Sequence, residues 1–327
     1  MKNEIITLGH GSGAGLTHKL IKEVFNRNFQ LPTLDDAVEI ENRMVVTTDS
    51  HVIKPIFFPG GDIGKLSVTG TVNDVSMSGA IPKYLLSAFI IEEGFKISDL
   101  KKIVESMKNA AEEAGVHIIA GDTKVVERGK ADGIYITTTG IGFLPAGVHL
   151  SSKNIQSGDK IIVNGTLGDH TVAIINAREN LELDPTPQSD CASLNGLVQL
   201  MLKNGEIKFL RDATRGGVAT ILNEVIEETN MGIIIEEDAV PIKDATRAVC
   251  GLLGLDPLYM ANEGKLVSFV SGDTSNLIAE MKKNELGKDS SIIGEVTTEV
   301  KGVYLRTSIG GLRPLLMLES DPLPRIC

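Results

Sequence analysis

Two hydrophobic periods alternate along the chain and predict a mixed succession of helices and strands. Apolar positions that recur every three to four residues predict helices, and short apolar runs bounded by turn residues predict strands. The predicted helices span 16–29, 98–115, 170–181, 194–203, 218–229, 243–253 and 275–284. The predicted strands span 44–50, 84–92, 116–120, 134–143, 160–164, 232–236, 266–271, 291–297 and 301–306. Ser98 and Gly115 are the expected cap and stop of the second helix. This alternation is typical of the α/β (α+β) class.

One further stretch, Pro59–Ala80, joins a glycine-rich turn to a predicted helix whose packed face is unusually polar. Spacings of three and four place Leu66, Thr69, Gly70, Asn73 and Met77 on one face of this helix. Asn73 and Asp74 lie among apolar residues, and carboxylates are rarely buried unless they are paired or bind a metal. The helix is either a simple N-terminus capped by Asp62 or part of a binding site.

The character of the chain changes over 145–159, a polar segment with glycine and proline that suits a linker. We therefore expect an N-terminal domain over residues 1–150 and a C-terminal domain over 151–320. Residues 321–327 are expected to form a flexible tail, because Pro322 and Pro324 exclude helix and central sheet.

Composition and charge narrow the possible functions. The 327 residues are 42% hydrophobic and carry a net charge of −11, as in a soluble protein of about two domains. The acidic balance, without a basic run, argues against a nucleic-acid partner. An apolar run of membrane-spanning length and a signal-peptide pattern are both lacking, so we expect a cytoplasmic protein and no membrane partner.

Carboxylates recur at the predicted ends of elements in the first half of the chain. They stand at positions 36, 49, 74 and 122, and three of them have an adjacent Thr, Ser or Asn. One such group is usually a turn residue, whereas four indicate a metal–phosphate site. The glycines of residues 9–15 could lay backbone amides against phosphate, although this loop matches neither a dinucleotide fingerprint nor a P-loop.

The cysteines form neither a metal-binding pattern nor a disulfide framework, because Cys191, Cys250 and Cys327 are an odd, widely spaced set. Cys327 is the last residue and follows Pro324-Arg325-Ile326.

Several segments together resemble the HypE family of carbamoyl dehydratases, which act in the assembly of nickel–iron hydrogenases. The likeness covers nearly the whole chain, and the tail 324–327 is its most specific part. Ala14, Gly15 and Thr171 depart from the family pattern. The matching segments are His10–Gly13, Thr48–Ser50, Phe57–Lys65, Gly70–Asp74, Gly121–Val126, Gly168–His170, Arg211–Gly217, Asn262–Lys265 and Pro324–Cys327.

The resemblance implies the two-domain fold of aminoimidazole ribonucleotide synthetase, with an N-terminal domain that dimerises through its sheet and a C-terminal α+β domain. It implies a homodimer that binds ATP and Mg²⁺ between the domains. The family dehydrates a carbamoyl group on the C-terminal cysteine to a thiocyanate. The carbamoyltransferase HypF supplies the carbamoyl group, and the iron-carrying HypC–HypD complex accepts the cyanide.

The resemblance also assigns roles to residues of this chain. Cys327, Glu263 and Lys124 are expected to be catalytic, with Glu263 as the base at the amide nitrogen and Lys124 orienting it or stabilising negative charge. The expected magnesium ligands are Asp36, Asp49, Asp74 and Asp212. The expected nucleotide-binding residues are Gly11, Ser12, Gly13, Asp62, Lys65, Thr71, Asn73, Asp122, Gly216 and Gly217.

Two other classes of function stay open from the sequence. One is a different ATP-dependent synthetase of the same fold, either a selenophosphate synthetase or an aminoimidazole ribonucleotide synthetase. The former carries a cysteine or selenocysteine in the N-terminal glycine-rich loop, where this chain has none, and the latter does not need Cys327. The other class is a scaffold that binds nucleotide without catalysis.

Overall fold

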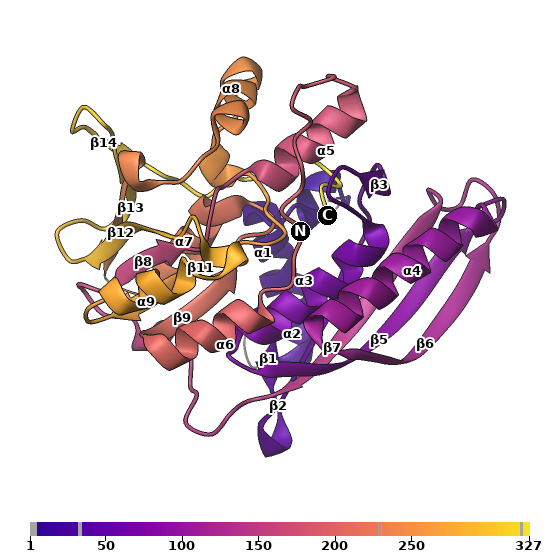
Figure 1. Ribbon diagram of the computed structural model, residues 1–327, viewed down its shortest axis with the longest axis horizontal. Coiled ribbons are helices and arrows are strands. Elements are labelled where there is room, and N and C mark those ends of the chain that lie inside the picture. The colour runs from indigo at the N-terminus through magenta and orange to yellow at the C-terminus, as the bar shows by residue number, and fades with distance from the viewer. Residues whose placement is uncertain (1–4, 32–34, 228, 230, 321–322) are drawn as a thin grey trace.

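Two β-sheets lie side by side in the computed structural model, which describes residues 5–31, 35–227, 229, 231–320 and 323–327 (Figure 1). The first sheet has the order β1-β2-β7-β5-β6, in which only the β5–β6 pair is parallel. Its strands are β1 (Val38–Glu39), β2 (Met44–His51), β5 (Ile81–Glu92), β6 (His117–Val126) and β7 (Ile134–Phe143).

The second sheet has the order β14-β13-β10-β12-β8-β11-β9. A two-stranded ribbon, β3 (Phe57–Phe58) with β4 (Gly61–Asp62), precedes helix α3. The strands of the second sheet are β8 (Lys160–Val163), β9 (Glu206–Asp212), β10 (Gly232–Glu236), β11 (Leu266–Ser271), β12 (Ser291–Thr297), β13 (Gly302–Arg306) and β14 (Leu312–Pro314).

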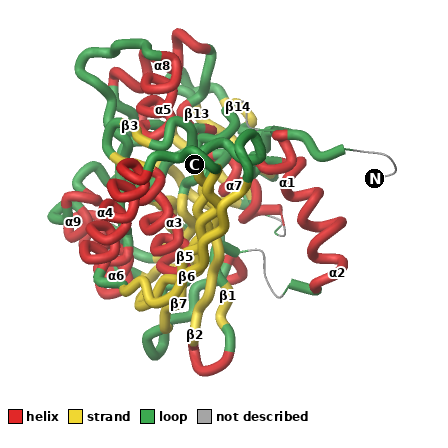
Figure 2. Tube along the Cα trace, turned by 90° about the vertical axis from the view of Figure 1, so that its right-hand side faces the viewer, coloured by secondary structure: helices red, strands yellow, loops and turns green. Residues whose placement is uncertain are grey.

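Helices α3 and α4 lie on one side of the first sheet, and α1 and α2 stand on the other side (Figure 2). The α-helices are α1 (Gly15–Leu20), α2 (Arg27–Phe29), α3 (Ile63–Met77), α4 (Ile97–Ala114), α5 (Asp169–Glu179), α6 (Asn195–Asn204), α7 (Gly217–Glu227), α8 (Asp244–Leu253) and α9 (Ser275–Met281). A π-helix, Ile21–Asn26, joins α1 to α2. Single 3₁₀ turns occupy Leu8–Gly11, Glu41–Arg43, Ser152–Asn154, Glu237–Ala239, Pro257–Tyr259 and Glu285–Gly287. Among the described residues, no helix is both long and apolar enough to cross a bilayer.

The predicted succession of elements is confirmed, while several details were wrong. Helix α4 begins at Ile97 and Ser98 does not cap it, although Gly115 ends it in the left-handed conformation as expected. The predicted strand 116–120 continues to Val126, because polar residues do not break an edge strand that is exposed on both faces. Strand β9 and the short strands β1, β3, β4 and β14 were missed.

Three of the four carboxylates predicted at element ends lie inside elements: Asp49 within β2, Asp74 within α3 and Asp122 within β6. The fourth, Asp36, lies just before β1, and Asp212, which was not among the four, ends β9. The prediction failed because it read a polar residue as a terminus, whereas here polar residues continue regular elements.

Helix α3 lies between the two halves of the molecule and contacts both of them. It contacts β2 and β7 of the first sheet, β9 of the second, and helices α4 and α6. Asp62 caps it by accepting hydrogen bonds from the backbone N–H groups of Gly64 and Lys65, as expected. Gly70 permits close packing on β2, because a Cβ there would lie 3.2 Å from His51 Cε1 and 3.5 Å from Asp49 Oδ2.

Asn73 ties α3 to the second half of the chain. Its Nδ2 donates to the carbonyls of Ala192 (3.0 Å) and Glu263 (3.4 Å), and its Oδ1 accepts from Leu194 N at 2.7 Å. The side chain is buried, so the polar face predicted for this helix consists partly of structural hydrogen bonds.

Replacing Asn73 with Ala is expected to lower the free energy of unfolding by about 2–5 kcal/mol, because a buried donor or acceptor left without a partner costs about 1–3 kcal/mol. Denaturant titration measures this loss. The control is Asn109→Ala, which is expected to change stability little because Asn109 is exposed on α4. A similar stability for both variants would contradict the bridging role.

Candidate active site

A cavity of about 590 Å³ collects the acidic side chains singled out in the sequence. Asp49 comes from β2, Asp74 from α3, Asp212 from the end of β9, and Asp36 from the segment before β1. Glu263 and Cys327 line the same cavity. The chain therefore brings together all four predicted magnesium carboxylates, the predicted base and the predicted reactive thiol.

The carboxylates destabilise one another's charged forms. Burial, followed by the charges of Asp212, Asp49 and Asp36, raises the pKa of Asp74 well above its ordinary value. Burial and the charge of Asp36 likewise raise the pKa of Asp212, and burial raises the pKa of Asp36 to about 6. A cation in the cavity would relieve this repulsion.

The residues fit magnesium held together with phosphate rather than magnesium held by protein alone. In the described part of the chain, no three His, Cys, Asp or Glu side chains are arranged so that they could hold a metal ion by themselves. Mg²⁺ usually binds one or two carboxylates, substrate phosphates and water. Asp36 Oδ2 is buried without a hydrogen-bond partner among the described residues, which leaves an oxygen for such a ligand.

One wall of the cavity is an ion-pair network that sequence reasoning missed. Arg211 Nε lies 2.7 Å from Asp36 Oδ1, and Arg211 Nη2 lies 3.2 Å from Glu224 Oε2. Glu224 Oε1 is 2.7 Å from His18 Nε2, and this hydrogen bond is the main reason that the pKa of His18 is raised. The network connects helix α1 to α7 and β9, and so holds the N-terminal helices beside the cavity.

Glu263 is an almost fully buried carboxyl group with an exposure of 3%. Its Oε1 has no hydrogen-bond partner among the described residues. Burial raises its pKa well above the ordinary value, as do Asp212, Asp190 and Asp49, while Arg215 opposes the shift. A carboxylate with a raised pKa is a stronger base, which suits proton abstraction near neutral pH.

The backbone around Glu263 is fixed by buried polar contacts. Asp190 accepts the Glu263 N–H at 3.0 Å and forms an ion pair with Lys265 at 2.9 Å. Thr171, a departure from the family pattern, donates its hydroxyl to the carbonyl of Ala261 at 2.9 Å. These contacts hold the segment 261–265 in place from both sides.

Arg215 is the most informative residue that the sequence analysis did not assign. It lines the cavity with Cys327 and donates from Nη1 to the Gly11 carbonyl at 2.8 Å. The negative charge of the terminal residue Cys327 is the main cause of its raised pKa. Gly13 has a φ of +76°, and a Cβ there would lie 2.6 Å from Arg215 Cβ, so the glycine loop can pass over this arginine only as glycine. Arg215 stands between Asp212 and Gly216 in the segment Arg211–Gly217, and this position was the sequence signal that could have identified it.

Several predicted residues lie outside the acidic cavity. Gly11 and Ser12 line a neighbouring cavity that also contains Cys327 and Arg215. Asp62 caps α3, Lys65 Nζ donates to Gly60 O at 3.2 Å, and Gly217 begins α7 directly after Gly216. Thr71 is buried against the hydroxyl of Thr138, and Asn73 holds the loops described above. In this arrangement Asp62, Thr71 and Asn73 have structural contacts.

Lys124 and Asp122 lie on β6 at the edge of the first sheet. Lys124 Nζ is 2.6 Å from Asp122 Oδ2, and both side chains are largely exposed. Neither residue lines the cavity that holds Glu263. Within one chain the structure therefore does not bring Lys124 to Glu263, and the predicted role of Lys124 requires a second subunit.

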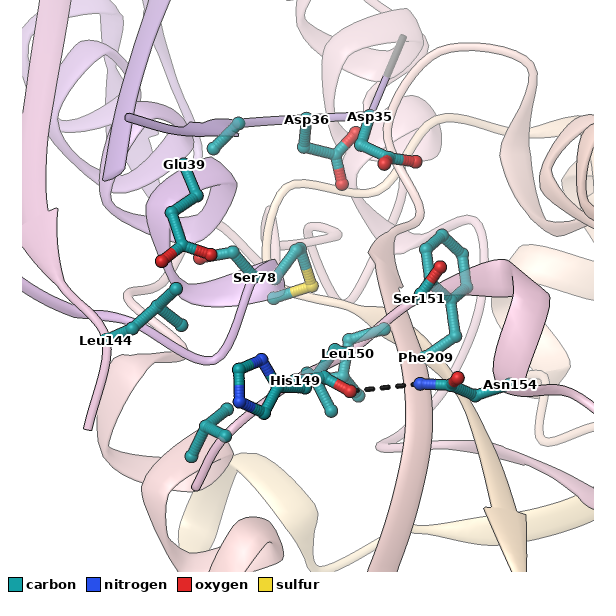
Figure 3. Close-up of a pocket in the computed structure, with 14 residues that line it drawn as sticks. Asp35, Asp36, Glu39, Ser78, Leu144, His149, Leu150, Ser151, Asn154 and Phe209 are labelled. Atoms are coloured by element: carbon teal, nitrogen blue, oxygen red, sulfur yellow. Dashed lines mark hydrogen bonds between the residues drawn. The ribbon is translucent and has the colours of Figure 1, made fainter. Parts of the chain in front are cut away.

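A second cavity of about 350 Å³ adjoins the first (Figure 3). Asp35 and Asp36 line both cavities, so this short segment forms the wall between them. On the far side, Glu39, His149 and Ser151 surround the space. Asp36 thus lies between the two cavities, where Arg211 pairs with its carboxylate at 2.7 Å and the Thr47 hydroxyl donates to its carbonyl at 2.7 Å.

Comparison with known proteins identifies the fold family of both halves of the chain. Residues 34–144 match the family model of the AIR synthase related protein N-terminal domain, and residues 156–305 match that of its C-terminal domain. The fold is therefore the two-domain fold of AIR synthase related proteins.

Full-length relatives define the family more narrowly. The carbamoyl dehydratase HypE of Cupriavidus necator is 48% identical and the match covers 100% of this chain and 96% of that protein. The crystal structure of a HypE–HypF complex contains a chain that is 49% identical, with a TM-score of 0.88 and coverage of 91% of this chain and 99% of that one. A crystal structure of HypE in complex with ATP is 43% identical, with a TM-score of 0.84 and coverage of 99% and 100%. The chain belongs to the HypE family of carbamoyl dehydratases.

The raised pKa values predict how the stability of the ligand-free protein depends on pH. A carboxyl group whose pKa is raised on folding stabilises the protein below its unfolded pKa of about 3.9 and loses that contribution as pH rises through the folded value. Asp74→Asn is therefore expected to be more stable than the parent protein at pH 8, because it lacks the charge that burial and the neighbouring carboxylates disfavour. Thermal unfolding at pH 4 and pH 8 tests this, and the difference should shrink toward pH 4. A variant that is less stable at pH 8 would contradict the repulsion.

Proposed function

We propose that this chain uses ATP to dehydrate a carbamoyl group carried on the Cys327 thiol, and so produces a thiocyanate for nickel–iron hydrogenase maturation. The observation that carries this proposal is the presence of Cys327, Glu263 and the carboxylate cluster in one cavity. Family membership supports it, since the relatives are named carbamoyl dehydratases and one was crystallised with ATP.

In the overall reaction, the oxygen of the carbamoyl group ends in the phosphate that is released. The carbonyl oxygen of the S-carbamoyl group receives the terminal phosphoryl group of ATP, and ADP leaves. The nitrogen loses two protons, the carbon–oxygen bond breaks, and phosphate departs with that oxygen. The sulfur then carries a C≡N group. An amide oxygen is a poor leaving group, and phosphorylation removes that obstacle.

Phosphoryl transfer depends mainly on position and charge. Asp36, Asp49, Asp74 and Asp212 would hold Mg²⁺, which when bound offsets the negative charge of the phosphates. The chain's own groups then align the reactants. Arg215, beside Cys327, supplies a fixed positive charge, and the glycine loop above it offers backbone amides.

Glu263 is the base that we assign to the amide nitrogen. It is buried, has an oxygen without a partner among the described residues, and lines the cavity with Cys327. The cavity is also lined by apolar side chains, namely those of Ile21, Phe25, Phe29 and Ile221. This lining suits a nucleotide whose base rests on apolar side chains and whose phosphates point toward the carboxylates.

A homodimer formed through the first sheet completes the proposal. Strand β6 is exposed along its length, with Ile119 56% and Val125 67% exposed. An uncovered apolar edge strand favours pairing with another chain. In such a dimer, Lys124 and Asp122 would lie at the interface rather than in solvent.

The partners follow from the chemistry of the tail. HypF is proposed as the carbamoyl donor, and the relative crystallised with HypF supports this. The HypC–HypD complex is proposed as the cyanide acceptor. The reaction is placed in the cytoplasm, where free cysteines remain reduced.

Glu263→Gln is expected to slow dehydration about 10²–10⁴-fold, because a positioned general base contributes about that much. Binding of magnesium-ATP should stay close to that of the parent protein. The measurement is phosphate release from protein already carbamoylated on Cys327. A loss below about tenfold would mean that another group is the base.

Cys327→Ala tests the function itself. This variant should bind magnesium-ATP and release no phosphate by dehydration, because it lacks the atom that carries the substrate. Mass spectrometry of the C-terminal peptide, after incubation with carbamoyltransferase, carbamoyl phosphate and ATP, should show a thiocyanate only in the parent protein. Dehydration by the alanine variant would overturn the proposed function, and a scaffold would show none in either protein.

The dimer is tested by charges placed on the sheet edge. Ile119→Glu combined with Val125→Glu is expected to give monomers in sedimentation experiments at tens of micromolar protein with ATP. Leu252→Glu, at a leucine of α8 that is 84% exposed, is the control and should stay dimeric. A parent protein that sediments only as a monomer would contradict the dimer.

A further inference from the structure

The last four residues are held by their main-chain carbonyl groups. The carbonyl oxygens of Pro324, Arg325, Ile326 and Cys327 all accept hydrogen bonds from donors elsewhere in the chain. These donors come from both halves of the molecule, because Val52 and Lys54 follow β2 while His170 and Arg178 lie on α5. The tail, which turns at Pro324 and Arg325, is thus docked between the two halves.

Arg178 joins two main-chain segments with one guanidinium group, through three carbonyl oxygens. Its Nη1 donates to Pro324 O at 3.1 Å, and its Nη2 donates to Arg325 O at 2.8 Å. Nε and Nη2 donate to Lys54 O at 3.0 and 2.7 Å. The planar guanidinium group of arginine presents N–H groups toward all of these carbonyls, which the single ammonium group of a lysine could not do.

His170 holds the next carbonyl, one residue before the reactive cysteine. Its Nε2 lies 2.7 Å from Ile326 O, which can only accept, so this nitrogen carries the proton. Nδ1 lies 2.8 Å from Ser189 Oγ and is the accepting nitrogen of a neutral ring. Burial lowers the pKa of His170, in agreement with a neutral imidazole.

Two backbone N–H groups complete the register. Lys54 N donates to Arg325 O, and Val52 N donates to Cys327 O, both at 3.3 Å. The Ile326 side chain is 2% exposed and belongs to the core beneath the first sheet. Arg325 has a φ of +55°, which costs a non-glycine residue about 1–2 kcal/mol, so the surrounding contacts must impose this conformation.

We propose that Arg178 and His170 are positioning residues of the dehydration reaction. They bind the main-chain carbonyls of the tail and thereby fix the distance from these carbonyls to the Cys327 thiol. The proposal rests on the proposed function, because it concerns how the substrate-bearing cysteine reaches Glu263 and the carboxylates. It predicts that the register of the tail matters in addition to its side-chain contacts, which are those of Arg325 with Val52 O at 2.8 Å and with Asp132, and the burial of Ile326.

Arg178→Gln is the principal test. Alkylation of Cys327, followed by mass spectrometry of the peptide released by cleavage after Glu319, should be at least about tenfold faster than in the parent protein, because the tail leaves its site more often. Dehydration of carbamoylated protein should slow by at least about tenfold, while magnesium-ATP affinity stays the same. Arg178→Lys should give an intermediate result, since it keeps the charge and loses the planar guanidinium group.

Matched variants separate positioning from general stability. Arg247→Gln, at an exposed arginine of α8, should leave alkylation and dehydration unchanged. Pro324→Ala keeps the carbonyl that Arg178 binds and should change both rates less than about threefold. Insertion of one glycine between Ile326 and Cys327 keeps the carbonyls that Arg178 and His170 bind but moves the thiol by about 3.5 Å, and it should abolish dehydration.

The outcomes are decisive for each proposal separately. Alkylation of Cys327 in Arg178→Gln within twofold of the parent rate, or full activity of the insertion variant, would overturn the positioning role. If Arg178→Gln lowers the melting temperature strongly, the insertion variant decides the question, because it alters no docking residue. Faster alkylation in Arg178→Gln together with no dehydration by the parent protein would support docking and count against the proposed function.

Discussion

Repulsion among buried carboxylates is the constraint on which the site depends. Asp36, Asp74 and Asp212 come from separate segments. In addition to burial, the charge of Asp36 raises the pKa of Asp74 and of Asp212, and the charge of Asp212 raises the pKa of Asp74. Such a cluster is unfavourable until a cation arrives, so the fold must hold it by other means. Arg211 does so on one side and the packing of α3 does so on the other. The energy stored in this repulsion becomes available for binding magnesium-ATP, since a ligand that relieves it binds more tightly.

Helix α3 shows why the scaffold tolerates this arrangement. Its face toward β2 carries Gly70, which lets the backbone approach Asp49 and His51, and its face toward the second half carries Asn73. Large apolar side chains at these positions would occupy the space between α3 and its neighbours and would push the two halves of the molecule apart. The polar, small-residue face is therefore a consequence of holding a site between two sheets.

The order of elements could be predicted because local periodicity decides it, and the acidic cavity could be predicted because family motifs carry its residues. Other features depend on contacts between distant segments. Three sets of contacts connect residues 119 or more positions apart: the pair of His18 with Glu224, the hydrogen bonds of Asn73, and the contacts of Arg178 with Lys54 and the tail. Lys124 could not be placed by either route, because it does not line the cavity in which its expected partner, Glu263, lies.

A substrate carried on the protein's own terminus changes what the site has to supply. Docking the tail makes the reaction intramolecular, so alignment with ATP costs little further entropy. The same tail must later leave, because the cyano group has to reach an acceptor that cannot enter the cavity. Hydrogen bonds to carbonyls suit both needs, since each adds about 0.5–1.5 kcal/mol and several together hold a segment that can still detach without unfolding the domains. The carbonyl contacts of Arg178 and His170 thus offer an affinity that is sufficient for alignment and low enough for release.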